Sequence, residues 1–209
     1  MTTIKVCGIT NLKDALLAAN LGANELGFNF CKASPRYIEP QAASQIVRRL
    51  PVTTRPVGVF VNETPEKTLE IARIASLYAV QLHGEESPAI VEELKMAGSL
   101  VVIKCFRVSN DFDAAEAAAF GADAVLLDSF SVSQHGGTGE TFDWSVAAKT
   151  AKMVDRLYLA GGLSPDNVAD AVKAVGPWAV DACSRLESAP GIKDAEKVRR
   201  FISNVRGCG

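Results

Sequence analysis

Two side chains that could move protons on a substrate stand at the ends of short apolar segments. Cys7 ends the first such segment, and Asp128 ends the sixth. A thiol that loses its proton near neutral pH can act as a base, and a carboxylic acid that keeps its proton can act as an acid. Taken singly, a strand cysteine is more often a small buried apolar residue, and a terminal aspartate more often caps a helix. The shared position at segment ends, which His83 also occupies, favours acid–base chemistry.

Eight short apolar segments alternate with amphipathic segments from one end of the chain to the other. Because parallel neighbours in a sheet require a helical crossover, this order predicts a parallel sheet with helices on both faces. Eight units within 209 residues favour one closed (β/α)8 TIM barrel, a single domain over residues 1–209, over an open doubly wound sheet. The expected strands are Ile4–Cys7, Glu25–Phe30, Pro56–Val61, Ala79–Leu82, Val101–Phe106, Ala124–Asp128, Leu157–Ala160 and Ala179–Cys183. The expected helices are Leu12–Leu21, Pro40–Leu50, Pro65–Leu77, Ser87–Gly98, Asp111–Phe120, Asp143–Val154, Pro165–Val175 and Ala195–Val205.

Residues that begin and end helices support this division. Thr64-Pro65 and Ser164-Pro165 each place a capping residue before a proline suited to a first helical turn. Segments 21–26 and 120–125 read Leu-Gly-Ala-Asn-Glu-Leu and Phe-Gly-Ala-Asp-Ala-Val. Each places glycine where a helix should end, so we interpret them as a weak repeat of the turn from helix to strand.

Side chains of a strand alternate between the barrel interior and the helix layer. The rule predicts an inner set of Lys5, Cys7, Asn29, Gly58, Phe60, Asn62, Gln81, His83, Lys104, Leu126, Asp128 and Asp181, and it leaves Val57, Val59 and Val61 for the helix layer. Buried charges are costly unless they are paired. We therefore expect Lys5, Lys104 and Asp181 to pair with one another or with a ligand, and for Lys5 we favour an ion pair low in the barrel.

Glycine-rich turns after the seventh and eighth expected strands indicate a phosphate site. Gly161-Gly162 follows the seventh strand, and Ser184-Arg185 follows the eighth. Barrel enzymes often hold a phosphate between these two loops, where backbone N–H groups point at its oxygens. The stretch His135–Gly139 lies in a long connection after the sixth strand, and its length and glycine content are typical of a mobile loop over a substrate. A connection without function is the alternative for that stretch.

Composition and charge argue against several classes of protein. The net charge is −2, and Lys and Arg gather only on expected helix faces, which argues against a nucleic-acid partner. No apolar run reaches the roughly 20 residues of a membrane span, and the first residues lack the parts of a signal peptide. Five cysteines without a C-x-x-C pair favour free thiols in the cytoplasm, and two histidines argue against a multi-histidine metal centre.

Further motifs occur in order along the chain, about one for each expected barrel loop. They are Lys5-Val6-Cys7-Gly8-Ile9-Thr10, Ser34-Pro35-Arg36-Tyr37-Ile38, Val57-Gly58-Val59-Phe60-Val61-Asn62, Val80-Gln81-Leu82-His83-Gly84, Leu126-Leu127-Asp128, Gly136-Gly137-Thr138-Gly139 with Phe142-Asp143-Trp144, Ala160-Gly161-Gly162-Leu163 and Pro190-Gly191-Ile192-Lys193-Asp194. Each motif is weak alone. Together they resemble the phosphoribosylanthranilate isomerase family, and the resemblance covers nearly the whole chain.

The resemblance implies an isomerase of tryptophan biosynthesis that acts on a phosphorylated small molecule. The family converts N-(5-phosphoribosyl)anthranilate to 1-(2-carboxyphenylamino)-1-deoxyribulose 5-phosphate by an Amadori rearrangement. Cys7 would be the base that takes the C2′ proton, Asp128 the acid that protonates the ring oxygen, and Arg36 the partner of the anthranilate carboxylate. The resemblance also implies substrate contacts from Gln81, His83, Gly136 and Gly137, and phosphate contacts from Gly161, Gly162, Ser184 and Arg185. It implies no cofactor and no metal, and the chain is expected to act without nucleic acid or membrane, as a monomer or a homodimer.

Two features of the chain leave alternatives open. The family usually has Ser-Gly after the eighth strand, whereas here Ser184 is followed by Arg185. Loss of that glycine could hinder the approach of a phosphate to the backbone, or the guanidinium could add a contact. A base also needs a lowered pKa, and for Cys7 both a nearby positive group and the N-terminal end of a helix remain open as the cause.

Other functions that remain open are two phosphosugar barrels and a non-enzymatic phosphosugar sensor. An indole-glycerol-phosphate synthase relies on lysines and a carboxylate at strand ends, whereas Cys7 ends the first strand here. A metal-dependent ribulose-phosphate epimerase needs histidine and aspartate ligands at several strand ends, and only His83 offers such a histidine. A sensor needs no acid–base pair, so Cys7, Asp128 and Arg36 together favour the isomerase.

Overall fold

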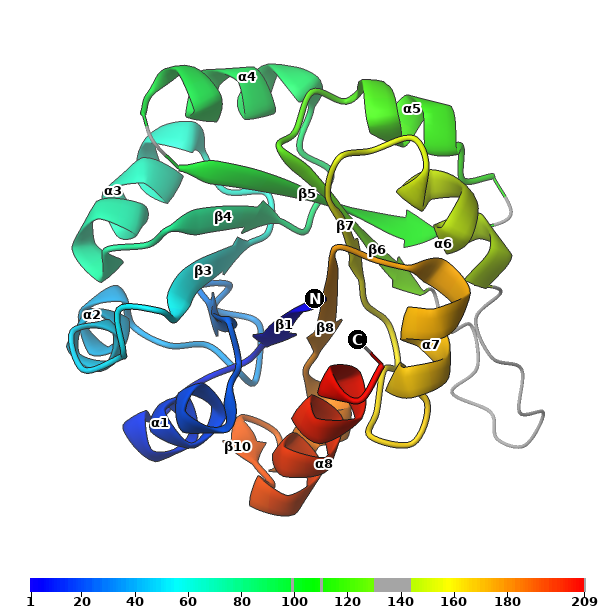
Figure 1. Ribbon diagram of the computed structural model, residues 1–209. Helices are drawn as coiled ribbons and strands as arrows, with labels where there is room; N and C mark the ends of the chain where they lie inside the picture. Colours follow the sequence, from blue (N-terminus) through cyan, green and yellow to red (C-terminus); the bar gives the residue numbers. More distant parts are fainter. Residues whose placement is uncertain (99, 110, 130–143, 209) are drawn as a thin grey trace.

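Eight parallel strands form a closed barrel in sequence order, with β1 hydrogen-bonded to β8. The computed structural model describes residues 1–98, 100–109, 111–129 and 144–208. Figure 1 shows the helices wrapped around the outside of the strands. The strands are β1 (Thr3–Val6), β2 (Glu25–Asn29), β3 (Arg55–Phe60), β4 (Ala79–Leu82), β5 (Val101–Val108), β6 (Ala124–Ser129), β7 (Leu157–Leu159) and β8 (Ala179–Ala182). The predicted TIM barrel is confirmed.

A helix follows each strand of the barrel, as predicted. The helices are α1 (Leu12–Leu21), α2 (Pro40–Val47), α3 (Pro65–Ala75), α4 (Pro88–Met96), α5 (Ala114–Ala119), α6 (Trp144–Ala151), α7 (Val168–Val175) and α8 (Ala195–Arg206). Within the described ranges, none of them has both the length and the apolar character of a membrane span.

The two predicted helix starts differ in outcome. Thr64 caps α3, because its side chain accepts a hydrogen bond from the Lys67 N–H. Ser164-Pro165 does not begin α7, which starts three residues later, at Val168. The amide side chain of Asn167 accepts a hydrogen bond from the Ser164 N–H at 2.8 Å and closes a turn there, so the prediction was wrong.

A short hairpin that the sequence pattern did not predict lies between β8 and α8. The chain leaves β8 through a single 3-10 turn, η1 (Ser184–Leu186), and then forms β9 (Glu187–Ala189) and β10 (Ile192–Lys193). Gly191 has a φ of 79°, which a residue with a side chain rarely adopts, so glycine allows the reversal between the two strands. The hairpin carries Glu187 and Lys193 back beneath the carboxyl end of the barrel.

The repeat seen in the sequence corresponds to one structural device used twice. The Asn24 side chain accepts a hydrogen bond from the Ile4 N–H of β1 at 3.0 Å. The Asp123 side chain accepts from the Val102 N–H of β5 at 2.9 Å. In both turns the polar side chain satisfies a strand amide just before the next strand begins, and this fixes the register of neighbouring strands.

The third strand faces the opposite way from the prediction. Val57 packs in the barrel interior with side chains of β4–β8, and Val59 and Val61 line the cavity above it. Phe60 belongs to the core between barrel and helices, where its ring stacks on Phe30 at 5.4 Å. Gly58 faces the same layer, because a Cβ there would lie 2.4 Å from the Leu77 side chain. Asn62, also predicted inside, hydrogen-bonds instead to the loop after β4.

Lys104 also faces the helix layer rather than the barrel interior. Its ammonium group forms an ion pair with Glu86 at 2.8 Å and donates to the Gly84 carbonyl at 2.7 Å. Its neighbours Ile103 and Cys105 occupy the interior instead. The prediction that Lys104 would pair with Lys5 and Asp181 or with a ligand inside the barrel was therefore wrong, whereas the prediction for Leu126 and Asp128 agrees with their positions in the interior and the upper cavity.

Candidate active site

The cavity that holds the predicted chemistry opens at the carboxyl ends of the barrel strands. It measures about 290 Å³ and is lined from seven of the eight strands or the loops that follow them. Every predicted site residue within the described part of the chain lines it: Cys7, Arg36, Gln81, His83, Asp128, Gly161, Gly162, Ser184 and Arg185. Gly136 and Gly137, with the whole stretch His135–Gly139, lie outside the described residues.

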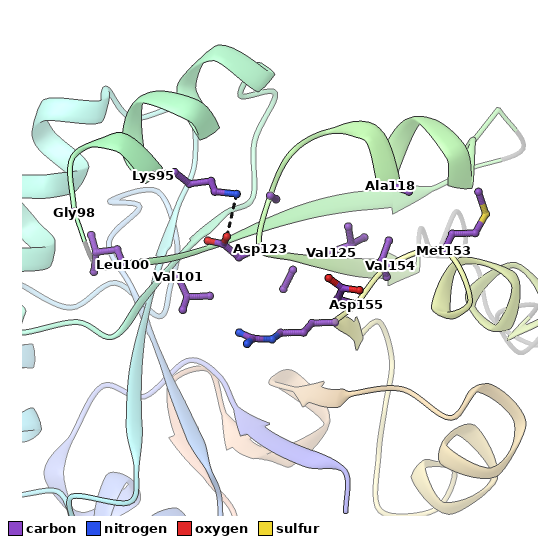
Figure 2. A pocket seen from close by; sticks show the side chains of 13 residues that line it. Lys95, Gly98, Leu100, Val101, Ala118, Asp123, Val125, Met153, Val154 and Asp155 are labelled. Atoms are coloured by element: carbon purple, nitrogen blue, oxygen red, sulfur yellow. Dashed lines mark ion pairs between the residues drawn. The ribbon is translucent and has the colours of Figure 1, made fainter.

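A larger cavity, of about 730 Å³, lies at the opposite end of the barrel (Figure 2). Its lining includes Val101, Ala124 and Arg156, which stand at or just before the beginnings of β5, β6 and β7. The Lys95–Asp123 ion pair, at 3.0 Å, spans one side of it. Barrel enzymes carry out their chemistry at the carboxyl ends of the strands. The smaller cavity, rather than the larger one, is therefore the candidate active site.

Cys7 directly follows β1 and lies beside Cys183, which directly follows β8. The strands pair in register as far as Val6 and Ala182, and the Cys7 N–H donates to the Ala182 carbonyl at 2.9 Å. The next residue on each strand is a cysteine, and both thiols line the cavity. On the other side of Cys7 a Cβ at Gly27 would come within 2.5 Å of its sulfur, so only glycine leaves room for the thiol.

A buried ion pair lies beneath Cys7 in the barrel. Lys5 is completely buried, and its ammonium group lies 2.8 Å from Asp181 Oδ2. Burial opposes the charge, but Asp181, and after it Cys7, raise the pKa of Lys5 above its ordinary value. Burial raises the pKa of Asp181 to about 7, although Lys5 acts against this shift. The pair predicted for Lys5 low in the barrel is present, and it places a positive charge under the thiol.

The pKa of Cys7 lies well below the ordinary value for a thiol. The main cause is a hydrogen bond from the Cys183 thiol, which stabilises the Cys7 thiolate. Burial acts in the opposite direction, and the positive charges of Lys5 and Lys193 add to the lowering. The same contact raises the pKa of Cys183, whose thiol also lies 3.8 Å from Glu187 Oε1. A neighbouring thiol and two lysines therefore favour the Cys7 thiolate, and the nearby positive group that the sequence left open is present as Lys5 and Lys193.

The hairpin β9–β10 supplies charged groups that the sequence did not reveal. Lys193 Nζ lies 3.0 Å from Glu187 Oε1 and 3.3 Å from the Cys183 carbonyl oxygen. Glu187 also receives Arg36, whose Nε donates to Oε1 at 2.9 Å and whose Nη2 donates to Oε2 at 2.7 Å. One carboxylate therefore holds two cations at the edge of the cavity. Among the described residues, nothing accepts a hydrogen bond from Arg36 Nη1, so this nitrogen is available to a ligand.

Asp128 lies across the cavity in a cluster at the ends of β4, β5 and β6. His83 Nε2 lies 3.4 Å from Asp128 Oδ2, and His83 Nδ1 lies 2.9 Å from the Gln81 side-chain amide. Burial opposes a charge on His83, but the hydrogen bond with Asp128 and then that with Cys105 raise its pKa to about 10. His83, held by Gln81 at one ring nitrogen, thus contacts the Asp128 carboxyl group with the other.

The loops after β7 and β8 present backbone donors without acceptors. The N–H groups of Gly161, Gly162, Ser184 and Arg185 make no hydrogen bond with any described residue. Gly161 and Gly162 have φ angles of 83° and 68°, which turn the backbone sharply at the cavity wall. Unpaired N–H groups on adjacent loops are suited to the oxygens of an anion. The N–H groups of Ser184 and Arg185 belong to the single turn η1 after β8, and those of Gly161 and Gly162 to the connection that precedes α7.

A closed parallel barrel with a cavity at the carboxyl ends of its strands, lined by a thiol of lowered pKa, a carboxyl group and backbone amides, has the architecture of a TIM-barrel enzyme. Residues 4–204 match the family model described as N-(5'phosphoribosyl)anthranilate (PRA) isomerase. The chain belongs to this family, and it is an isomerase of tryptophan biosynthesis.

Relatives and solved structures agree over almost the full length. The N-(5'-phosphoribosyl)anthranilate isomerase of Citrifermentans bemidjiense is 49% identical over 206 residues, which cover 99% of this chain and 98% of that protein. The crystal structure of phosphoribosyl anthranilate isomerase from Thermotoga maritima is 43% identical and superposes with a TM-score of 0.91, covering 99% of this chain and 100% of that one. A phosphoribosyl anthranilate isomerase in complex with reduced 1-(o-carboxyphenylamino)-1-deoxyribulose 5-phosphate is 41% identical, with a TM-score of 0.89 and coverage of 99% and 100%.

Proposed function

We propose that the cavity at the carboxyl end of the barrel catalyses the Amadori rearrangement with Cys7 as base and Asp128 as acid. The observation that carries this assignment is the position of an activated thiol and a carboxyl group on two sides of one small cavity. The two groups come from β1 and β6, so a furanose between them can meet one on each side. The solved complex of a relative with a reduced product analogue supports a ligand of this size and chemistry.

The chemistry follows from where each proton goes. Asp128 gives its proton to the furanose ring oxygen as the bond from C1′ to that oxygen breaks, and C1′ becomes double-bonded to the anthranilate nitrogen. The Cys7 thiolate then takes the C2′ proton, and the electron pair of that bond forms a C1′–C2′ double bond and neutralises the nitrogen. A proton delivered to C1′, together with loss of the proton of the C2′ hydroxyl group, converts the resulting enol to the C2′ ketone. Two protons are given up and two are taken up, so Cys7 and Asp128 return to their starting states and no external oxidant or reductant is needed.

Both ends of the substrate have partners in the cavity. We assign the phosphate to the backbone amides of Gly161, Gly162, Ser184 and Arg185, because all four residues line the cavity and none of these N–H groups has an acceptor among the described residues. We assign the anthranilate carboxylate to Arg36, whose free Nη1 can donate while Glu187 holds the rest of the guanidinium. Gln81 and His83 hold Asp128 in position, and both line the cavity wall, from which they can contact the substrate. Gly136 and Gly137 remain predicted substrate contacts.

The setting of the enzyme is also a proposal. We assign it to the cytoplasm on the basis of five cysteines that are all free, which is typical of a reducing compartment. Residues 1–209 are proposed to form one domain that acts as a monomer or a homodimer on its phosphorylated substrate, and a relative described as dimeric supports the second possibility.

Replacement of Cys7 tests the assignment of the base. In Cys7→Ala, kcat should fall by about 10²–10⁴-fold while KM stays within a few-fold, because a general base acts in the transition state and contributes little to binding. Cys7→Ser should show a similar fall in kcat, since a hydroxyl group loses its proton far less readily than a thiol. Turnover is followed by the loss of anthranilate fluorescence, and Cys31→Ala, which alters a thiol outside this cavity, is the matched control. A Cys7→Ala enzyme with nearly unchanged kcat would remove Cys7 from the mechanism.

A further inference from the structure

Three side chains able to bind a metal converge inside the barrel: His83 directly follows β4, Cys105 lies within β5, and Asp128 lies near the end of β6. His83 Nε2 lies 3.4 Å from Asp128 Oδ2 and 3.8 Å from Cys105 Sγ. The donor atoms of all three residues lie within 4.8 Å of one another. Cys105 takes no part in the rearrangement proposed above, so the proton chemistry does not account for the third donor.

Two of the three distances between donor atoms match those that tetrahedral zinc imposes on its ligands, and the third, from Cys105 to Asp128, lies within 4.8 Å. Bonds of about 2.0–2.1 Å to nitrogen and oxygen and about 2.3 Å to sulfur place N and O about 3.4 Å apart, and N and S about 3.6 Å apart. The observed 3.4 Å and 3.8 Å differ from these values by about 0.2 Å or less. We propose that His83, Cys105 and Asp128 form a binding site for a thiophilic divalent cation such as Zn²⁺, with the fourth position open to the cavity.

The surroundings hold the donors in place for such an ion. The Gln81 side-chain nitrogen lies 2.9 Å from His83 Nδ1 and holds the ring so that Nε2 points toward the other two donors. Cys105 lies in the apolar interior of the barrel beside Ile103 and Leu126, where a thiolate has little stabilisation unless a cation supplies it. A mixed set of imidazole, thiolate and carboxylate favours Zn²⁺ over Mg²⁺ or Ca²⁺, which prefer oxygen ligands alone.

The bound ion would inhibit the isomerase rather than assist it. Coordination occupies the Asp128 carboxylate, so this group can no longer carry the proton that the ring oxygen must receive. Binding displaces the thiol proton of Cys105 and the Nε2 proton of His83, and both protons pass to solvent. The inhibitory consequence rests on the proposed role of Asp128, whereas the binding of the ion does not.

Cobalt titration of the full chain tests the binding directly. Co²⁺ bound to a thiolate produces a sulfur-to-metal charge-transfer band in the near ultraviolet, and this band reports the site without turnover. The band should appear at one equivalent of Co²⁺ in the native chain and in Cys208→Ala, which removes a thiol at the far end of α8. Cys105→Ala should lose the band and bind at least roughly 100-fold more weakly, since removing a ligand costs more than removing an outer partner. Asp128→Asn provides a second variant, in which the band persists but the affinity falls.

The outcomes separate the metal site from the catalytic assignment. A band that survives in Cys105→Ala and disappears in Cys183→Ala would place the ion on the Cys7–Cys183 thiols and overturn the proposal. If the site is correct, Zn²⁺ should inhibit the native isomerase, EDTA should restore its activity, and Cys105→Ala should resist inhibition at least about 100-fold better. Cobalt bound through Cys105 together with unimpaired turnover would leave the binding site standing and overturn the role of Asp128 as acid.

Discussion

The thiol of Cys183 should control the pH at which the isomerase becomes active. The structure places this thiol beside Cys7, where its hydrogen bond is the main cause of the lowered Cys7 pKa. Cys183→Ala removes the donor and leaves Lys5 and Lys193, the two cations that also favour the thiolate. The pKa of Cys7 should therefore rise, but not to the value of an isolated thiol.

The size of the shift follows from the strength of one hydrogen bond to a charged group. Such bonds contribute about 1.5–3 kcal/mol, and a thiol is a weak donor, so the lower end applies. One pKa unit corresponds to about 1.4 kcal/mol, which gives a rise of about one unit for Cys7. Because the base must be deprotonated, the acidic limb of kcat/KM should move upward by about one pH unit. Below that limb the variant should be about tenfold slower than the native enzyme, and above it the two rates should converge.

Two measurements distinguish this tuning from a merely structural effect. The first is the pH profile of kcat/KM, which reports groups of the free enzyme. The second is the rate at which iodoacetamide alkylates Cys7, located by mass spectrometry, since this rate follows the thiolate fraction. Cys183→Ser retains a hydroxyl donor and should return the limb toward its native position. The reasoning would be refuted by a Cys183→Ala enzyme whose limb does not move, or whose rate falls equally at every pH.

Three further changes test other parts of the structure. Gly27→Ala should lower kcat by about 10²-fold, because its Cβ would lie 2.5 Å from Cys7 Sγ and must displace the base. Arg185→Gly should change KM only a few-fold, because the backbone amides are the main phosphate donors; a loss of roughly 1.5–3 kcal/mol would show that the guanidinium binds directly. Lys104→Met should lower the free energy of unfolding in urea by about 3 kcal/mol, because it leaves the buried carboxylate of Glu86 without its cation.

Matched variants make these results interpretable. Gly207→Ala adds a methyl group whose nearest contact is an ordinary 3.5 Å, so its kcat should match that of the native enzyme. Lys67→Met breaks the exposed ion pair with Glu70 and should leave urea unfolding unchanged. If Gly27→Ala retains full kcat, the thiol has more freedom than the structure gives it. Equal stability of Lys104→Met and Lys67→Met would mean that Glu86 finds other partners.

The arrangement of strands could be predicted from the sequence, but the inward face of a strand often could not. In the sixth strand the polar Asp128 marks the inner face, and the prediction was right. The third strand has valine at alternate positions and Phe60 between them, and both of its faces are buried, so alternation alone does not tell which is which. Alternation likewise predicts Lys104 inside, although its neighbours Ile103 and Cys105 occupy the interior. Its partner Glu86 comes from a loop on the outer side of the barrel, and the sequence around Lys104 does not indicate this pairing.

The candidate site divides in a similar way. Cys7 and Asp128 could be identified because each ends a strand, and their position depends only on the barrel order. Glu187 was not identified, and Lys193 was noted only within the motif Pro190–Asp194 without a role, because both act from a hairpin that the strand and helix pattern does not predict. The two residues act on Cys7 only through contacts made in the folded protein. Lys193 contributes a positive charge, and Glu187 forms ion pairs with both Lys193 and Arg36.

Cys183 lies between these two cases, and it shows what closure of the barrel adds. Residues 7 and 183 are far apart in the chain, yet a barrel of eight strands must pair its first strand with its last, and both cysteines end those strands. The closed topology alone therefore predicts that the two thiols meet. What it does not predict is which of them carries the charge. Lys5 beneath Cys7 favours the charge on Cys7, whereas Lys193 lowers the pKa of both thiols, so β1, β8 and the hairpin together favour a thiolate in this pair. A change in the hairpin that displaces Lys193 should raise the pKa of Cys7 without touching any group that contacts the substrate.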